Sequence, residues 1–234
     1  MLGWGMQQLF DQESFTYTYL LWDSASHEAV LVDPVLEMVE RDLQLVNELG
    51  LKLKYILETH VHADHVTGAG VIRSRTGAQT GLSHHAGVQC ADLALRHGQE
   101  LFLGNEKLQV METPGHTQTC LTYIWQGHLL TGDSLMIRGC GRTDFQQGSA
   151  EAMFHSIRDI LFQFPDSTVI FPAHDYRGFN QSSVGAEKAF NPRIGLHKTK
   201  PEFLQIMADL KLAEPKKISQ ALPANLACGK LTGR

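Results

Sequence analysis

The sequence predicts a layered α/β fold. Short apolar segments rich in β-branched and aromatic residues alternate with amphipathic helical segments and hairpins along most of the chain. At 234 residues and 43% hydrophobic content, the chain is long enough to bury an extensive core. No repeat of fixed period interrupts this pattern. We therefore expect one domain over residues 1–234, with a short helical C-terminal appendage from about residue 185, where prolines punctuate a more charged pattern.

The first part of the chain is expected to contain three strands and one helix. The strands are expected over residues 15–22, 28–33 and 53–59. The first is rich in aromatic and β-branched residues, and the second ends in an Asp-Pro turn signal. From Leu36, apolar residues recur every three or four positions until Gly50, which predicts an amphipathic helix between the second and third strands.

The same patterns predict further strands and a second long helix beyond residue 100. These strands are expected over residues 107–112, 120–125, 128–131 and 168–171. The helix is expected over about 150–163 because apolar residues recur there with helical spacing. Its expected apolar face includes Ala152, Phe154, Ile157 and Leu161.

Charge and hydropathy exclude two classes of partner. Twenty basic residues against 25 acidic ones give a formal charge of -5, and no segment holds the dense Lys/Arg run that a phosphate backbone attracts. No apolar run approaches the roughly 20 residues of a membrane-spanning helix. The opening segment also lacks the features of a targeting peptide. We therefore expect a cytoplasmic protein that binds neither nucleic acid nor membrane.

The cysteines are expected to be reduced thiols. The chain has four, which are widely scattered: Cys90, Cys120, Cys140 and Cys228. No two of them form a C-x-x-C pair, so the spacing suggests neither a zinc knuckle nor a disulfide framework.

The segment "THVHADHVTGAG", residues 59–70, is the strongest functional signal in the sequence. It places His60, His62, Asp64 and His65 within six residues, where the third expected strand emerges into a loop. Crowding so many ionisable groups is costly without a cation to compensate them. The cluster therefore predicts a metal site.

Three other segments present ligand side chains at expected turns or strand ends. In "TPGHTQTC" a Pro-Gly turn presents His116, in "LLTGDS" an apolar strand ends at Asp133, and in "VIFPAHDY" another ends at His174. In α/β sheets, sites form outside the carboxyl ends of strands, because loops converge there. We expect all of these ligands to converge on one site.

These motifs carry a resemblance to a known family. "THVHADH", "PGHT", "TGDS" and "PAHDY", in that order over residues 59–176, resemble the metallo-β-lactamase superfamily. That resemblance implies an αββα sandwich of two sheets with the metal at one edge. Within the superfamily, "GDSLMIRGCGRTDFQQG" and "HDYRGF" resemble the persulfide dioxygenases, or sulfur dioxygenases, the family of the ethylmalonic encephalopathy protein. The N-terminal segments and the late "NPR" and "PAN" segments extend the likeness over nearly the whole chain.

The number of metal ions stays open on the ligand set alone. Two ions could be held as in the dinuclear hydrolases of the superfamily. One would take His60, His62 and His116, and the other would take Asp64, His65 and His174, with Asp133 as the bridge. The resemblance to persulfide dioxygenases implies instead one Fe(II) per chain, held by His60, His116 and Asp133. Two histidines and one carboxylate form the facial triad of non-haem iron oxygenases, which leaves positions open for substrate and dioxygen.

In the single-iron scheme, the remaining ligand types would act through hydrogen bonds. His62, Asp64, His65 and His174 would then orient the iron ligands and the iron-bound water. Because these residues are retained, zinc is an alternative occupant.

The resemblance further implies glutathione persulfide and dioxygen as substrates, converted to sulfite and glutathione. Arg138 and Arg142 follow Asp133 closely, and their guanidinium groups could hold the carboxylates of glutathione. Ordinary salt bridges are the alternative for both arginines. Tyr176 could place a phenol near the substrate, with core packing as its alternative. Cys140 and Cys228 are expected near the pocket but inert.

Two rival functions remain. The first is a dinuclear zinc thioesterase like glyoxalase II, against which stand the "RTDFQQG" segment and the short C-terminal region. The second is a non-catalytic metal-dependent sulfur sensor, which differs by the absence of turnover. The oligomeric state is open, with a homodimer as one expectation.

Overall fold

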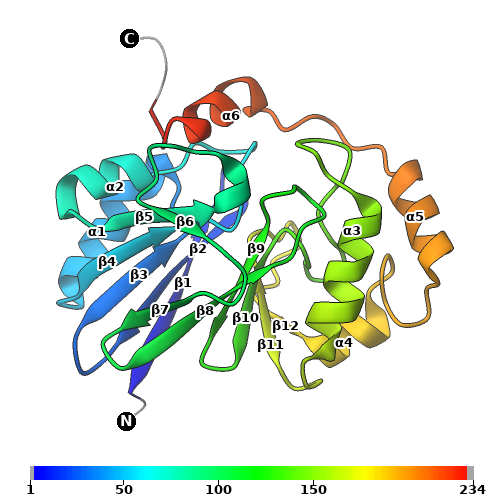
Figure 1. Ribbon diagram of the computed structural model, residues 1–234, viewed down its shortest axis with the longest axis horizontal. Helices are drawn as coiled ribbons and strands as arrows, with labels where there is room; N and C mark the ends of the chain where they lie inside the picture. Colours follow the sequence, from blue (N-terminus) through cyan, green and yellow to red (C-terminus); the bar gives the residue numbers. More distant parts are fainter. Residues whose placement is uncertain (1–2, 231–234) are drawn as a thin grey trace.

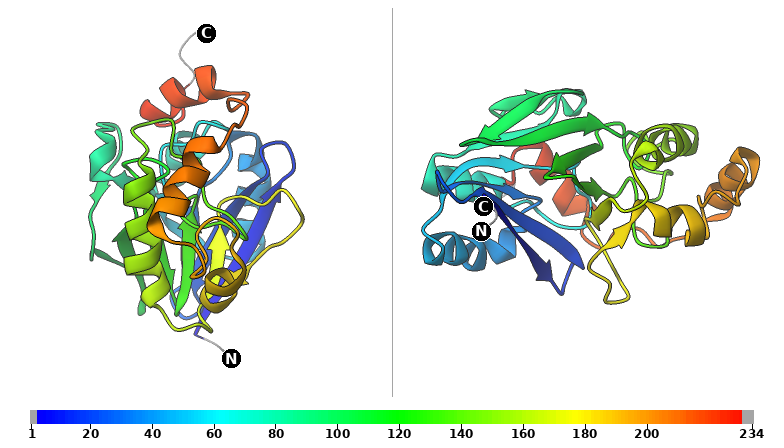
Figure 2. Two further views of the ribbon diagram at one scale, coloured as in Figure 1. Left: turned by 90° about the vertical axis from the view of Figure 1, so that its right-hand side faces the viewer. Right: turned by 90° about the horizontal axis from the view of Figure 1, so that it is seen from below.

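The computed structural model describes residues 3–230, and these form two mixed β-sheets packed face to face with helices on the outer sides (Figures 1 and 2). The strands of the first sheet, in spatial order, are β1 (Trp4–Asp11), β2 (Thr16–Asp23), β3 (Glu28–Val32), β4 (Lys52–Leu57), β5 (Gln79–Ser83) and β6 (Leu93–Leu95). Those of the second are β12 (Ser182–Ser183), β11 (Val169–Pro172), β10 (His128–Gly132), β9 (Leu121–Trp125), β8 (Glu106–Glu112) and β7 (Glu100–Leu103). The αββα sandwich that the resemblance implied is confirmed.

The helices divide between the two outer faces. The first sheet is covered by α1 (Val39–Glu48), which follows a short 3-10 turn η1 (Leu36–Met38), and by α2 (Ala69–Thr76). The second is covered by α3 (Ala150–His155), which continues through η3 (Ser156–Ile160) and η4 (Leu161–Gln163), and by α4 (Val184–Phe190) and α5 (Lys200–Asp209). The last helix, α6 (Ile218–Leu226), lies at the top of the sandwich in Figure 1.

Three hydrophobic layers hold this arrangement together. The central layer lies between the sheets and contains the fully buried Tyr19, Tyr123 and Trp125. The second joins the first sheet to α1 and α2, and the third joins the second sheet to α3, α4 and α5. Burial of apolar side chains of this size contributes about 1.5–3 kcal/mol each. The layers therefore fix the strand ends from which the site is built.

The predicted strands and the two long helices are all present, with ends shifted by a few residues. The predicted helix over 150–163 contains a π-type turn, η3. Its most buried side chains are those of Met153, Ile157 and Leu161, so Met153 was missed. Strands β1, β5, β6, β7 and β12 and the helix α2 were also not predicted. These strands are short or carry polar residues among their apolar ones, which weakens the alternating pattern, and α2 has only eight residues.

The expectation that all cysteines are reduced is wrong for two of them. Cys90 and Cys228 form a disulfide across a sequence separation of 138 residues. Their sulfur atoms meet because the segment after α6 folds back beside the loop that follows β5, and spacing in the sequence does not reveal such a contact. Cys120 and Cys140 are free and buried, as expected.

The C-terminal segment is spread over both halves of the sandwich. α4 and α5 pack on the second sheet, whereas Ala221 and Ala224 of α6 contact Val66 beside the histidine-rich loop. The description of this segment as an appendage to a single domain stays a prediction. Among the helices of residues 3–230, none is both long and apolar enough to cross a membrane. The cytoplasmic location also stays a prediction.

Candidate metal centre

The predicted ligand residues meet at one edge of the sandwich. His60, His62 and His65 lie in the loop after β4, and His116 lies in the segment between β8 and β9. Asp133 directly follows β10, and His174 follows β11. The hydrophobic layers hold these strands, so the loops deliver the side chains to a common point, as expected for the carboxyl ends of strands.

A single glycine shows why the chain can turn into the site at Asp133. Gly132 has φ +54°, and a Cβ atom there would lie 2.8 Å from the Cβ of Thr59. Any other residue would meet both a strained backbone and a steric clash. The sequence signal "TGDS" therefore reflects a tight turn that brings the carboxylate against the loop after β4.

His60, His116 and Asp133 form one compact donor group. Each offers one donor atom, and these three atoms lie within 4.8 Å of one another. Nε2 of His116 lies 3.6 Å from Oδ2 of Asp133. The other carboxylate oxygen, Oδ1, is buried and has no hydrogen-bond partner among residues 3–230. A buried carboxylate oxygen without a donor is costly unless a cation binds it, so this group fits a metal ion.

The tautomers of the two histidines leave their Nε2 atoms free. Nδ1 of His116 lies 2.7 Å from the carbonyl oxygen of Arg142, which can only accept, so Nδ1 carries the proton. Nδ1 of His60 lies 3.0 Å from the Thr59 hydroxyl oxygen, whose own proton is donated to Asp33 at 2.8 Å. His60 Nδ1 is therefore the donor as well. Such hydrogen bonds fix the ring orientation of metal-binding histidines.

Burial favours the neutral form of His60. Burial, with repulsion from His62 and His116, holds the pKa of His60 well below its ordinary value. A neutral imidazole has a lone pair available for a metal at neutral pH.

Two buried carboxylates contact the Nε2 atom of His62. Its Nε2 lies 3.0 Å from Oδ1 of Asp33 and 3.2 Å from Oε2 of Glu58. Burial alone would lower the pKa of His62, but these two carboxylates outweigh burial and raise it well above its ordinary value. The opposite nitrogen, Nδ1, is buried without a hydrogen-bond partner. Asp33 and Glu58 were not predicted as site residues, since only a turn signal marked Asp33.

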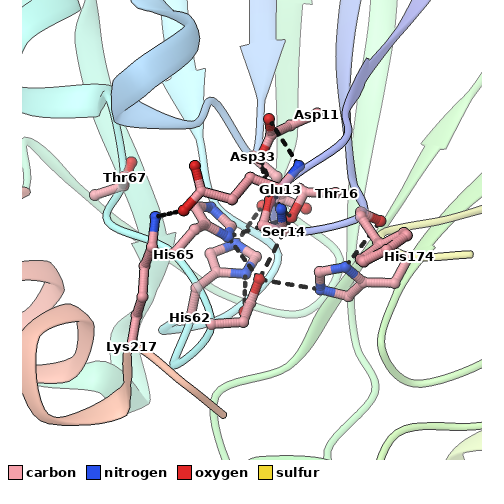
Figure 3. A network of polar contacts seen from close by, with 12 residues as sticks. Asp11, Glu13, Ser14, Thr16, Asp33, His62, His65, Thr67, His174 and Lys217 are labelled. Carbon is pink, nitrogen blue, oxygen red and sulfur yellow. Dashed lines mark hydrogen bonds and ion pairs between the residues drawn. The ribbon is translucent and has the colours of Figure 1, made fainter. Parts of the chain in front are cut away.

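Asp64 contacts both His65 and His174, and Figure 3 shows these two imidazole rings directed toward the centre of one polar network. Oδ2 of Asp64 lies 2.9 Å from Nδ1 of His65 and 3.6 Å from Nε2 of His174. Burial would raise the pKa of Asp64, but His65 and His174 hold it well below its ordinary value. For His174 the directions are reversed. Burial would lower its pKa, but the carboxylates of Asp133 and Asp64 raise it above its ordinary value.

His62, Asp64 and His65 form a second donor group next to the first. Donor atoms of His62, Asp64 and His65 also lie within 4.8 Å of one another. Nε2 of His65 is buried without a partner, as is Nδ1 of His62. His62 is thus grouped with Asp64 and His65, whereas the dinuclear scheme placed it with His60 and His116. Two neighbouring donor groups still accommodate either one ion or two.

A cavity of about 570 Å³ opens in front of the first donor group. His116, Asp133 and His174 line it, as do all three predicted substrate-binding residues: Arg138, Arg142 and Tyr176. Its size is in the range of cavities that bind small organic ligands.

The comparisons with known proteins agree with this geometry. The model of the metallo-beta-lactamase superfamily matches residues 12–174. The mitochondrial persulfide dioxygenase ETHE1 of Homo sapiens is 47% identical over 230 residues, which cover 97% of this chain and 89% of that protein. The chain belongs to the persulfide dioxygenase family of the metallo-β-lactamase superfamily. The resemblance noted in the sequence is thereby confirmed.

The solved structures agree at the level of the fold. A crystal structure of ETHE1 from Myxococcus xanthus superposes with a TM-score of 0.94 at 48% identity, covering 97% of this chain and 100% of that one. A metallo-beta-lactamase structure from Staphylococcus aureus reaches a TM-score of 0.87 at 23% identity, covering 97% of this chain and 73% of that one. The second match shows the shared fold alone.

In this persulfide dioxygenase chain, both predicted arginines make salt bridges. Arg142 forms a bidentate pair with Asp144 at 2.6 and 2.7 Å and donates to the carbonyl oxygen of Ala213 at 2.7 Å. Arg138 pairs with the buried Glu187. Both guanidinium groups therefore stabilise segments that line the cavity, which agrees with the alternative that these arginines form ordinary salt bridges. Tyr176 is 64% exposed and stacks on His174, so the core-packing alternative for Tyr176 is wrong.

Two arginines that the sequence reasoning missed line the cavity without a carboxylate partner. Within the described part of the chain, neither Arg177 nor Arg193 has an acidic group within salt-bridge distance. Arg193 donates to the carbonyl oxygen of Cys140 at 2.6 Å, and Arg177 donates to that of Ile137. Arg193 belongs to the "NPR" segment and Arg177 to the "HDYRGF" segment, two of the motifs that carry the resemblance.

Of the two cysteines expected near the pocket, only Cys140 lines it. Burial raises the pKa of the Cys140 thiol to about 11, so it is protonated at neutral pH. Its sulfur lies 3.8 Å from that of Met207, within a hydrophobic cluster. Cys140 therefore behaves as a core residue, whereas Cys228 is held in the disulfide.

Asn225 of α6 clamps the metal-binding loop, and the sequence reasoning missed it. Its side-chain nitrogen donates to the carbonyl oxygens of His62 and His65 at 2.8 and 2.9 Å, and its oxygen accepts from the N–H of Thr67 at 2.9 Å. All three contacts are buried. A single side chain thus satisfies the backbone of the loop that carries three of the predicted metal-site histidines. The "PAN" segment contains this residue.

We expect Asn225→Ala to weaken metal binding at least tenfold and to lower the melting temperature. Each buried backbone group left without a partner costs about 1–3 kcal/mol, and three would lose theirs. The metal dissociation constant and thermal unfolding of the variant measure both effects. Gln220→Ala, at an exposed position of the same helix, is the matched control. Similar behaviour of the two variants would show that Asn225 does not hold the loop.

Proposed function

We propose that this persulfide dioxygenase oxidises glutathione persulfide with dioxygen to sulfite and glutathione at a single Fe(II). The observation that carries the proposal is the donor group of His60, His116 and Asp133, two members of which, His116 and Asp133, line the cavity. Two imidazoles with free Nε2 atoms and one carboxylate are the ligand set of non-haem iron oxygenases. The near full-length likeness to proteins named persulfide dioxygenase supports the same reaction class.

When bound by His60, His116 and Asp133, iron would supply the redox chemistry that lets a persulfide react with dioxygen. Both oxygen atoms pass to the terminal sulfur, the S–S bond breaks, and one water completes sulfite. The balance is persulfide, dioxygen and water giving glutathione, sulfite and two protons. No external reductant is needed.

The chain's own residues bind and orient the substrate. The glycine and γ-glutamyl carboxylates of glutathione require cationic donors, and Arg177 and Arg193 offer guanidinium groups not neutralised by an acidic partner. The predicted contacts of Arg138, Arg142 and Tyr176 with substrate remain part of the proposal, since all three line the cavity. Behind the donor group, His62, Asp64, His65 and His174 would orient the ligands. A homodimer stays a prediction.

One observation favours the dinuclear zinc thioesterase as the second candidate. The donor group of His62, Asp64 and His65 lies beside the first, with buried nitrogen atoms that have no partner. A hydrolase with two zinc ions would use both groups. The likeness to dioxygenases over nearly the whole chain argues against this candidate.

The function is tested by following dioxygen consumption and sulfite formation during a titration with glutathione persulfide. The proposal predicts saturable dioxygen uptake, with about one sulfite formed per dioxygen, as the balanced reaction requires. A glutathione thioester is the comparison substrate. Thioester hydrolysis without dioxygen uptake would establish the rival enzyme, and no turnover of either substrate by metal-loaded protein would establish the sensor.

A further inference from the structure

A third cluster of metal-ligand residues lies outside the site described above. Donor atoms of His84, His85 and Glu112 lie within 4.8 Å of one another. None of these residues lines the 570 Å³ cavity, and none belongs to the two donor groups of the metal centre. The cluster therefore has no part in the proposed reaction.

The local fold aims the two histidines at the same carboxylate. Strand β5 ends at Ser83, whose hydroxyl accepts from the backbone N–H of His85 at 3.2 Å and so caps the short turn η2 (His84–Ala86). In this turn the two imidazole rings lie 3.8 Å apart at an interplanar angle of 40°. Two consecutive histidines thus face the same side, although neighbouring residues of an extended strand would face opposite sides.

One of the two separations matches ligands of a tetrahedral ion, and the other is about 0.3 Å longer than the range for such ligands. Nδ1 of His84 lies 3.4 Å from Oε1 of Glu112, and Nε2 of His85 lies 3.9 Å from Oε2. Ligands at 2.0–2.2 Å from a tetrahedral ion lie about 3.3–3.6 Å apart. Nδ1 of His84 also lies 3.3 Å from the carbonyl oxygen of Leu95, so it carries the proton in this contact. An ion would displace that proton, and small side-chain rotations would then bring all three donors onto the ion.

Among the described residues, no lysine or arginine neutralises the carboxylate of Glu112. Within residues 3–230, only His84 and His85 lie within salt-bridge distance of it. The backbone N–H of His97 donates to Oε1 of Glu112 at 3.2 Å, which orients the carboxylate without neutralising it. A divalent cation would supply the missing positive charge.

We propose that His84, His85 and Glu112 form a second, separate binding site for a zinc-type divalent cation. Two imidazoles and one carboxylate are ligands that suit Zn²⁺. The side chains are 19%, 39% and 27% exposed, so an ion can reach them and water can complete its coordination.

The position of the site assigns it a structural role. His84 and His85 follow β5 of the first sheet, whereas Glu112 ends β8 of the second. A bound ion would therefore join the two sheets at one edge. Glu112 also precedes the turn that carries His116 by only a few residues, so the ion would hold the start of that turn.

The test is zinc binding to the protein loaded with its own metal, measured by equilibrium dialysis against Zn²⁺ with metal analysis of the dialysed protein. We expect wild-type protein to bind one zinc ion beyond its resident metal. His85→Ala and Glu112→Gln should each weaken this extra binding at least tenfold, and His85→Ala should keep the resident metal. Zinc should also raise the melting temperature of wild-type protein but not of His85→Ala.

Two controls separate this site from other binding. His65→Ala removes a donor of the metal centre and should keep the extra zinc. His155→Ala removes an exposed histidine that pairs with Asp159, and it should also keep the extra zinc. The proposal is overturned if wild-type protein binds no extra zinc, if His85→Ala and Glu112→Gln bind it as wild type does, or if His65→Ala alone loses it.

Discussion

Replacing Asp133 with Ala is expected to remove the metal and abolish persulfide oxidation, whereas His65→Ala is expected to retain most of the metal. Asp133 supplies the single carboxylate of the first donor group, and within the described part of the chain its buried Oδ1 accepts no hydrogen bond. Loss of a direct ligand should reduce metal affinity on the order of a hundredfold or more. A residue that only orients ligands typically contributes roughly tenfold to a hundredfold.

Metal content after gel filtration, compared between the two variants and wild type, measures this difference. Thermal unfolding of each variant shows whether a loss of metal reflects unfolding instead. Equal metal loss in both variants would mean that His65 is a direct ligand, which is the dinuclear scheme.

Replacing Arg193 with Ala is expected to lower kcat/KM for glutathione persulfide about tenfold to a hundredfold, mainly through KM. A charged hydrogen bond to a substrate carboxylate contributes roughly 1.5–3 kcal/mol, and each 1.4 kcal/mol corresponds to about tenfold. The side chain makes one hydrogen bond within the protein, to the Cys140 carbonyl, so little stability should be lost. Steady-state dioxygen consumption across a persulfide titration, with metal content measured on the same preparation, tests this.

Arg142→Ala is the comparison variant for Arg193→Ala, because within residues 3–230 Arg193 forms no salt bridge whereas Arg142 does. Its guanidinium is bound to Asp144 and to the carbonyl of Ala213, so its removal should lower the melting temperature in addition to any rise in KM. If Arg193→Ala lowered the melting temperature and left KM unchanged, Arg193 would be a structural residue. The carboxylates of the substrate would then have to be bound elsewhere in the cavity.

The parts of the site that the sequence predicted are those encoded in short local motifs. His60, His116, Asp133 and His174 each lie beyond the end of a predicted strand, so their convergence follows from the geometry of an α/β sheet. The fold was predictable for the same reason, since the long helices and most strands carry clear periodic patterns.

The parts that were missed depend on contacts between distant segments. Asn225 reaches the loop of His62 across a separation of 163 residues, and Cys90 pairs with Cys228. Whether a cationic side chain is free for substrate likewise depends on its neighbours, which distinguishes Arg193 from Arg142. No local pattern encodes such contacts, because tertiary packing decides them.

The central claim is that a single iron ion, held by His60, His116 and Asp133, carries the reaction. The most direct measurement is metal analysis of protein purified without added metal, with dioxygen consumption assayed on the same samples. The account predicts about one iron per chain and activity that rises in proportion to iron content. Two zinc ions per chain in fully active protein, with no dependence of activity on iron, would contradict it.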